Sequence, residues 1–217
     1  MKKNVFVFLF IMTAFVAFSQ NGVIRELAGS VEIKRAGDAN FIAASAGDIL
    51  REDTVISTGF RSTALIEVGS TLLTVRPLTR LSLMEIRSSA GTETINVNLQ
   101  AGRVRVDVNP PAGTRANMQV TSPVATASVR GTSFEFDTRN IFVNSGVVNY
   151  SGNRGPMWQV RSGLSSNLSE DGRASDPVVI RRQGLRPSPP AGTDDSVRAS
   201  DDTGFTQSSV ISIIIGY

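Results

Sequence analysis

The sequence has no cysteine and no histidine among its 217 residues. Without cysteine, the chain cannot form disulfide bonds, thiolate metal sites or a cysteine nucleophile. Without histidine, it lacks the commonest general base and the commonest transition-metal ligand. Paired carboxylates and calcium sites are the chemistries that this composition leaves open. The two absences therefore favour a protein that works without catalysis and without a cofactor.

Few residues remain from which an active site could be built. Glu52 and Asp53 are adjacent carboxylates in an expected turn, and Asp194–Asp195 is a second pair in an expected linker. Neither pair has the flanking aromatic residues that a sugar-cleaving site would need, and no segment has the alternating oxygen ligands of a calcium loop. We expect no catalytic residue, no metal ligand and no cofactor site. Trp158, the one tryptophan, is expected to pack on the core.

The segment 1–19 is typical of a secretory signal peptide. Two lysines follow the initiating methionine, and an apolar stretch runs from residue 5 to residue 18. Ala17 and Ser19 supply the small residues that cleavage before Gln20 requires. Because the stretch is short for a bilayer span, an uncleaved anchor is the weaker alternative. We expect export, to the periplasm or out of the cell.

Removal of this segment changes the charge of the chain. The full sequence has 22 basic and 19 acidic residues, and loss of Lys2 and Lys3 leaves 20 basic against 19 acidic. A chain so close to neutral is a poor partner for nucleic acid, whose binding depends on phosphate neutralisation. We expect no nucleic-acid partner, and membrane contact only through a partner or an uncleaved signal.

From residue 23 onward, hydrophobic and polar residues alternate with a period of two, which is typical of strands with one buried face. Glycine-containing turns separate the runs at short intervals, and no window of helical length keeps a helical period. We predict a single all-β domain of many short strands over 23–168, built as a sandwich or roll or as a solenoid-like stack. The clearest runs are Val31–Lys34, Ala64–Val68, Leu81–Ile86, Ile95–Leu99 and Val104–Val108.

The pattern glycine, any residue, valine, any residue, apolar residue occurs three times within these runs. It begins at Gly29, Gly102 and Gly146, at irregular spacing, so it is no periodic repeat. In each case the glycine is expected to adopt a positive φ at a turn that leads into a strand. We interpret the recurrence as repeated use of one turn chemistry.

The character of the chain changes after Leu168. The segment 169–206 is rich in Pro, Ser, Gly and Asp, which predicts a flexible segment without a core. The last residues, 207–217, are strongly apolar and β-branched, and they predict a strand that needs covering. Whether that strand docks on this domain or on a partner stays open.

The segment Ser122–Phe134 resembles the signature of the FecR domain family, T-P-x-A-x-x-x-V-R-G-T-x-F. Two further parts of the chain are similar to elements of the same family: Gly47–Asp48 with Asp53–Gly59 to its G-D-x-V-x-T-G turn, and Leu99–Val104 to its L-x-x-G-x-V element. The similarity runs over roughly Thr54 to Val148 in the order that the family has. The resemblance implies an all-β domain exposed outside the cytoplasm.

The best-known members of that family regulate iron-siderophore signalling in Gram-negative envelopes, with a cytoplasmic anti-sigma segment and a transmembrane helix before the domain. Here only the predicted signal peptide precedes the domain, so the resemblance implies the exported domain and not sigma-factor control. We expect a non-catalytic binding or scaffold module whose partner is an envelope protein or a cell-wall or surface glycan. The alternative is a periplasmic signalling module that contacts a membrane receptor, with the anti-sigma function on another chain.

Between Asp107 and Glu135 the only charged side chains are Arg115 and Arg130, and Arg130 is the one that lies within the motif. Its five donors would suit capping of backbone carbonyls at a turn or pairing with one of those two carboxylates, and we favour this structural role. The alternative is that Arg130 captures an anionic ligand or a carboxylate of a partner. The residues to which the motif assigns a structural or partner-binding role are Pro123, Arg130, Gly131, Thr132 and Phe134.

Overall fold

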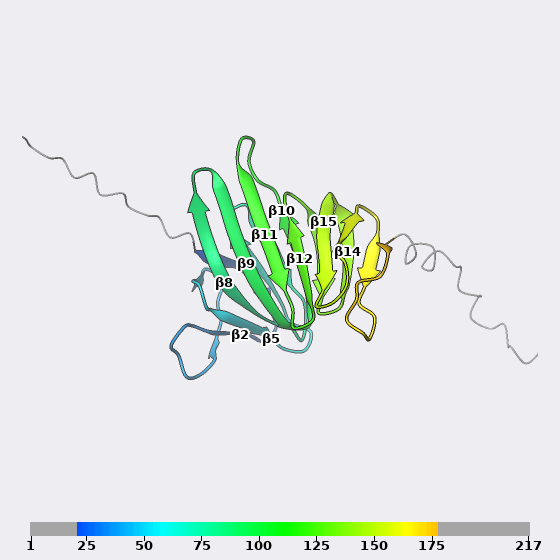
Figure 1. Cartoon of the computed structure of the whole chain (residues 1–217). Coiled ribbons are helices and arrows are strands. Elements are labelled where there is room, and N and C mark those ends of the chain that lie inside the picture. The colour runs from blue at the N-terminus through cyan, green and yellow to red at the C-terminus, as the bar shows by residue number, and fades with distance from the viewer. Residues whose placement is uncertain (1–20, 178–217) are drawn as a thin grey trace, which may run out of the picture. The chain divides into compact units, whose positions relative to one another are not determined.

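The structure is a computed structural model that describes residues 21–177, and these residues form seventeen strands in two sheets (Figure 1). Sheet A has the strand order β17 (Ser165–Asn167), β14 (Asn140–Ser145), β13 (Ser133–Asp137), β10 (Arg103–Val108), β7 (Thr71–Val75), β6 (Thr63–Val68), β1 (Gly22–Ala28) and β4 (Ile49–Leu50). Sheet B has the order β16 (Trp158–Arg161), β15 (Val147–Gly152), β12 (Ala125–Val129), β11 (Arg115–Thr121), β9 (Thr92–Ala101), β8 (Arg80–Ser89), β5 (Val55–Thr58), β2 (Val31–Lys34) and β3 (Ile42–Ala43).

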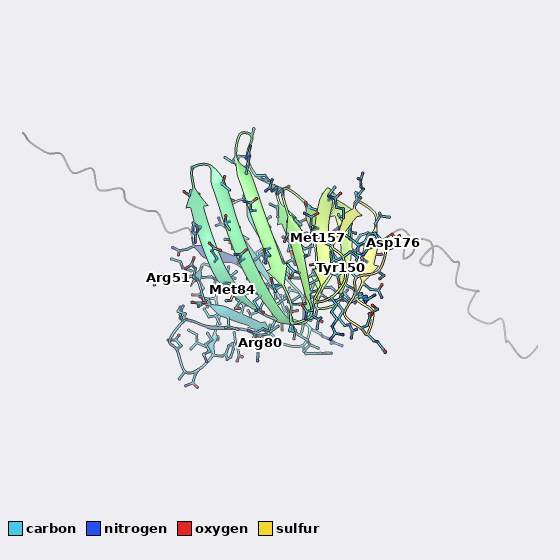
Figure 2. All side chains as sticks on the ribbon, viewed as in Figure 1. Arg51, Arg80, Met84, Tyr150, Met157 and Asp176 are labelled. Atoms are coloured by element: carbon cyan, nitrogen blue, oxygen red, sulfur yellow. The ribbon has the colours of Figure 1, made fainter. Side chains whose placement is uncertain are left out.

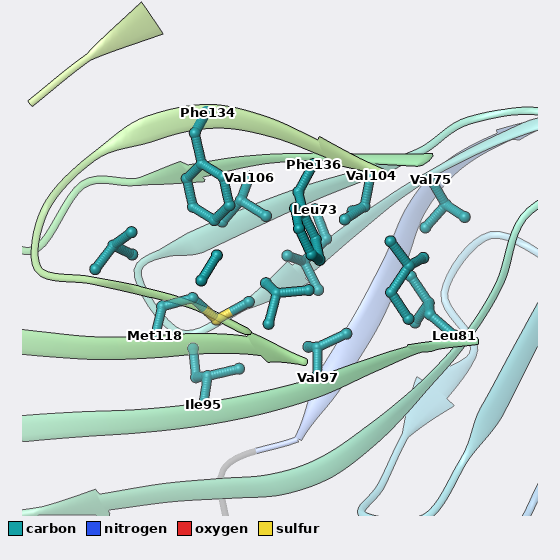
Figure 3. Close-up of a cluster of buried hydrophobic side chains, with 14 of the residues drawn as sticks. Leu73, Val75, Leu81, Ile95, Val97, Val104, Val106, Met118, Phe134 and Phe136 are labelled. Atoms are coloured by element: carbon teal, nitrogen blue, oxygen red, sulfur yellow. The ribbon is translucent and has the colours of Figure 1, made fainter. Parts of the chain in front are cut away.

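The predicted all-β fold is confirmed, and the two sheets pack face to face as a sandwich. Along β6, β10 and β12, buried and partly exposed residues alternate, as the period of two predicts. Side chains of both sheets interdigitate in one core (Figure 3). Sheet A contributes Leu73, Val104, Val106, Phe134 and Phe136, and sheet B contributes Leu81, Ile95, Val97 and Met118.

Each of the three recurring glycines lies at a point where the chain passes from one sheet to the other. Gly29 lies between β1 and β2, Gly102 between β9 and β10, and Gly146 between β14 and β15. All three have the positive φ that the sequence predicts. A buried hydroxyl bonds the next residue's backbone at each corner: Ser62 Oγ accepts from Ser30 N (2.8 Å), Thr79 Oγ1 accepts from Arg103 N (2.9 Å), and Thr132 Oγ1 donates to Val147 O (3.3 Å). At all three corners, therefore, a glycine turn carries the chain into the other sheet, and a buried Ser or Thr hydroxyl holds that turn by a hydrogen bond to the backbone.

Ordered structure continues beyond Leu168, where the sequence predicts a flexible segment from residue 169. Ala174 is buried, its carbonyl accepts a hydrogen bond from Trp158 Nε1 (3.0 Å), and Ser166 Oγ donates to Ser175 O (2.7 Å). The predicted boundary is thus too early, because hydrogen bonds rather than an apolar run hold this polar stretch. Trp158 packs against the core as expected. The predicted signal peptide 1–19, the later part of 169–206 and the apolar end 207–217 lie outside the described residues.

Within residues 21–177 there is no helix with the length and apolar character needed to cross a membrane.

Candidate functional site

Most residues of the motif Ser122–Phe134 have a structural environment that is easy to assign. Ser122 Oγ donates to Thr138 O (2.8 Å) and accepts from Ala125 N (3.0 Å), so it fixes the entry to β12. Pro123 is exposed in that entry, and its carbonyl accepts a hydrogen bond from Asn153 Nδ2 (3.0 Å). The alternating residues of β12 then enter the core. This half of the motif holds the backbone in place.

The end of the motif forms the turn into β13. Gly131 has a φ of 65°, which other residues rarely adopt. Thr132 is 2% exposed, and its carbonyl accepts a hydrogen bond from Val108 N (3.0 Å). Phe134 is fully buried between the sheets. Thr132 and Phe134 therefore contact the rest of the domain and present little surface to a partner, whereas Gly131 is exposed in the turn.

Arg130 differs from its neighbours, and the structural role predicted for it is wrong. Its side chain is exposed and makes no hydrogen bond or ion pair with any residue from 21 to 177. Asp107 is held instead by Arg105 and Ser133, and Glu135 is paired with Arg76 (3.0 Å). Those carboxylates lie on sheet A, whereas Arg130 follows Val129 at the end of a sheet B strand whose inward positions are taken by apolar residues. Alternation therefore places this guanidinium outside.

Arg130 borders the outer face of sheet B, the face turned toward the reader in Figure 1. Cross-strand pairing aligns polar side chains on this face into straight rows, since directly opposed residues project to the same side. The central row crosses six strands from β8 to β16. Its members, in order, are Glu85, Asn96, Gln119, Ser128, Asn149 and Gln159. We call this the amide row.

Two further rows flank the amide row. On one side lie Asn98, Thr121, Thr126 and Ser151, a row of small polar side chains. On the other side Asn117 pairs with Thr94, and Val147 pairs with Arg161. Arg130 lies in line with Asn117 and Val147, and these three residues line the same shallow hollow. We call the whole surface, with Arg130 and Arg161 at its margin, the amide face.

Much of the hydrogen-bonding capacity of the amide face is open. Asn96 Nδ2 donates to Glu85 Oε2 (2.5 Å), and Gln119 Nε2 donates to Thr121 Oγ1 (3.3 Å). The side-chain amides of Asn117, Asn149 and Gln159 have no partner among the described residues. Each such amide offers two donors and an acceptor oxygen to a ligand. The face can therefore bind a polar molecule without first breaking internal contacts.

The outer face of sheet A is organised in the opposite way. Its charged side chains neutralise one another in four ion pairs: Arg25–Glu67 (2.6 Å), Arg76–Glu135 (3.0 Å), Arg103–Asp137 (3.5 Å) and Arg105–Asp107 (3.0 Å). Burial opposes ionisation of Asp107, but hydrogen bonds from Arg105 and Ser133 outweigh it and hold the pKa of that carboxyl below its usual range. The side chains of these four ion pairs are thus already neutralised by partners within the domain.

The carboxylate pair considered for catalysis does not converge on a site. Glu52 Oε1 accepts a hydrogen bond from Ile86 N (2.9 Å), and Asp53 occupies a tight turn with a φ of 60°. Over residues 21–177, no group of three or more acidic side chains is placed so that it could hold a metal ion. The second pair, Asp194–Asp195, lies outside the described residues. These carboxylates act locally in the turn and form no cluster.

Residues 54–149 match the family model described as FecR protein, and this part of the chain is a FecR domain. Two crystal structures of a proposed anti-sigma factor from Parabacteroides distasonis ATCC 8503 are similar, each with a TM-score of 0.46 and 14% or 13% identity. The match covers 56% of this chain and 57% of that one, so it spans little more than half of the other protein. No curated protein matches the sequence.

The amide face was not predicted from the sequence, although a signal for it was present. Apart from Arg115, the outward positions along β9 and β11 are Thr, Asn and Gln in place of the usual charged residues. Within a single strand, outward Thr, Asn and Gln residues cannot be told from an ordinary solvated surface. Only the pairing register shows that the amides of several strands form one row.

Proposed function

We propose that the chain is an exported, non-catalytic binding module of the cell envelope, and that its amide face holds a carboxylate-bearing cell-wall or surface glycan. One observation carries this proposal. Arg130 is exposed at the margin of the amide face and unpaired among residues 21–177, whereas Val129, Thr132 and Phe134 of the same motif are buried. A free guanidinium on a surface of open amides suits recognition of an anionic, hydroxyl-rich ligand.

The chemistry of the face supports a glycan as its ligand. Sugar hydroxyls donate and accept hydrogen bonds, as do the side-chain amides of Asn117, Asn149 and Gln159. Arg130 and Arg161 flank Val147 on successive strands. Two strand spacings separate them, roughly 10 Å, which would allow each to meet a different carboxylate along an extended polymer.

The composition of the face favours a glycan over a protein surface. Protein–protein interfaces have a core enriched in aromatic residues and methionine. The residues of the central hollow are instead mainly amides, hydroxyl residues and glycines, whose polar groups suit a ligand rich in hydroxyls. A signalling module that contacts a membrane receptor remains the second candidate, and the FecR domain at residues 54–149 is the observation that favours it.

Binding to soluble polysaccharides of known charge tests this proposal. Polygalacturonate serves as the acidic probe and dextran as the neutral one. Arg130→Ala should weaken binding to the acidic probe roughly tenfold or more, because it removes a charge-assisted bidentate contact. Arg51→Ala is the matched control, since Arg51 is also exposed but lies away from the amide face (Figure 2).

Three outcomes would contradict the proposal. Equal affinity for polygalacturonate and dextran would show that the carboxylates of the ligand are not recognised. Equal losses of affinity in Arg130→Ala and Arg51→Ala would show that binding depends only on the net charge of the chain. Cross-linking in intact cells from position 149 that captured one membrane receptor and no glycan would favour the signalling alternative.

A further inference from the structure

Two tight turns lie side by side at one end of the sandwich. The first, Gly59–Arg61, joins β5 to β6, and the second, Arg76–Leu78, joins β7 to β8. Leu78 N donates to Gly59 O (3.2 Å), which links the turns directly. We call these two segments the twin-turn tip. It contains Gly59, the glycine that closes the G-D-x-V-x-T-G element of the FecR resemblance.

A buried threonine fixes the position of both turns. Thr58 Oγ1 donates to Arg76 O (2.6 Å) and accepts from Thr79 N (3.0 Å), so one hydroxyl spans the base of the tip. The backbone of Thr58 also donates to Thr79 O (2.9 Å). The tip is therefore a rigid projection of the domain.

The turns place unusual residues in a strained conformation. Arg61 has a φ of 53° and Leu78 a φ of 56°, although turns with a positive φ at this position ordinarily use glycine or asparagine. A leucine in the left-handed region is an outlier. Strain of this kind persists where the surrounding structure enforces it, and it is often associated with function.

The strained turns display large apolar side chains to solvent. Phe60 is 71% exposed and Leu78 is 62% exposed. Each turn therefore projects one of these side chains from the same end of the domain. Glycine at position 78 would satisfy the backbone without exposing any apolar surface. The observed leucine adds exposed apolar surface that the turn itself does not need.

Arg61 in the tip, and Arg80 and Arg139 near its second turn, have no carboxylate partner among residues 21–177. The guanidinium of Arg61 lies 5.5 Å from the centre of the Phe60 ring, and that of Arg80 lies 5.4 Å from the Phe41 ring. Arg139 lines the hollow beside Leu78, and its guanidinium donates to Ser169 O. The nearby carboxylates Glu135 and Asp137 are already paired with Arg76 and Arg103. The tip therefore combines apolar projections with uncompensated positive charge.

We propose that the twin-turn tip docks the domain on an anionic lipid surface. Phe60 and Leu78 enter the boundary between headgroups and acyl chains, and the unpaired arginines meet the lipid phosphates. Two projecting side chains present too little area for a stable protein interface. They are well suited to reversible membrane contact, in which each nearby cationic residue strengthens binding roughly fivefold. This contact is separate from glycan binding at the amide face.

The absence of cysteine makes a residue-specific test possible. Phe60→Cys, Leu78→Cys and Met157→Cys each introduce a single thiol, which is labelled with a polarity-sensitive fluorophore. Met157 is the control because it is equally exposed, at 63%, on the loop before β16. With phosphatidylglycerol vesicles, labels at 60 and 78 should shift to the blue and the label at 157 should not. Phosphatidylcholine vesicles should produce no shift, and raised salt should reverse the response.

Two substitutions measure the contribution of the tip in the unlabelled chain. Leu78→Gly suits the backbone of the turn, so the fold should be retained while co-sedimentation with phosphatidylglycerol vesicles falls several-fold. Arg61→Ala should also weaken vesicle binding, whereas Arg51→Ala should leave it unchanged. The proposal is overturned if the chain does not bind these vesicles, if all three labels respond alike, or if Leu78→Gly binds as the unmodified chain does.

Discussion

Thr79 lies directly against Gly102 at the corner where the chain crosses from sheet B to sheet A. A Cβ atom added to Gly102 would stand 2.5 Å from the Cα of Thr79, closer than real contacts allow. The hydroxyl of Thr79 also accepts a hydrogen bond from Arg103 N (2.9 Å). The L-x-x-G-x-V element of the sequence is therefore explained by this corner, where close approach and a φ of 88° both require glycine.

Gly102→Ala should lower the free energy of unfolding by at least about 2 kcal/mol, because the left-handed strain and the clash with Thr79 add together. Gly37→Ala is the matched control. Gly37 has a φ of 83°, but a Cβ there would meet nothing within 4 Å. It should lose only about 1 kcal/mol, from strain alone. Urea unfolding of both variants gives the comparison, and equal losses would contradict the close-contact explanation.

Arg130→Ala should change the free energy of unfolding by less than about 0.5 kcal/mol, since an exposed and unpaired side chain adds little to stability. Thr132→Val, two residues away, removes the hydroxyl bonded to Val147 O and should cost roughly 1–2 kcal/mol. Thermal unfolding of the two variants measures both losses of stability. A loss at Arg130 as large as that at Thr132 would restore the structural role rejected above.

Asp107 should make the stability of the domain depend on pH in the acid range. Its pKa is lowered in the folded state, where burial is outweighed by hydrogen bonds from Arg105 and Ser133. A carboxyl with a lowered folded pKa stabilises the fold above its unfolded pKa, and this contribution is lost as the pH falls below about 4. Asp107→Asn should therefore flatten the acid limb of a plot of melting temperature against pH.

Asp38→Asn is the control for that experiment, because the side chain of Asp38 is exposed in a turn. The melting temperature of this variant should follow the unmodified chain at each pH. The assignment to Asp107 fails if Asp107→Asn keeps the full acid limb, or if both variants lose it equally.

Leu78→Gly should not destabilise the domain, although it removes a large side chain. Leu78 is mostly exposed, and glycine tolerates the φ of 56° at that position. We expect an unfolding free energy that is unchanged or higher by up to about 1 kcal/mol. Chemical denaturation measures it. A clear loss of stability would mean that Leu78 packs on the domain and does not serve as a free projection.

The strands and the core were predictable because one physical signal governs both. In segments such as Val104–Val108 and Ala125–Val129, apolar and polar residues alternate strictly, and the apolar set is the one that is buried. The end of the domain was placed too early because the stretch after Leu168 is held by hydrogen bonds, which leave no hydrophobic pattern. Arg130 was misjudged because a lone charge in an apolar segment was taken to be buried, whereas its position beyond Val129 turns it outward.

The candidate surfaces could not be derived from the sequence, since both depend on which segments become neighbours. The amide row joins Asn96, Gln119 and Asn149 from separate strands, and their alignment follows from the pairing register. The twin-turn tip likewise brings the turn that contains Phe60 beside the turn that contains Leu78, although the two turns join different pairs of strands. Local patterns predict the elements, and the pairing of those elements creates the surfaces.

The central claim, that the amide face binds an acidic glycan, is tested most directly by nuclear magnetic resonance. Side-chain amide signals of Asn117, Asn149 and Gln159 and the guanidinium signal of Arg130 are followed while an oligogalacturonate is added. Our account predicts that these signals shift together and saturate, while the ion-paired Arg25 and Arg76 on sheet A do not respond. Shifts confined to sheet A, or none on the amide face at saturating ligand, would contradict it.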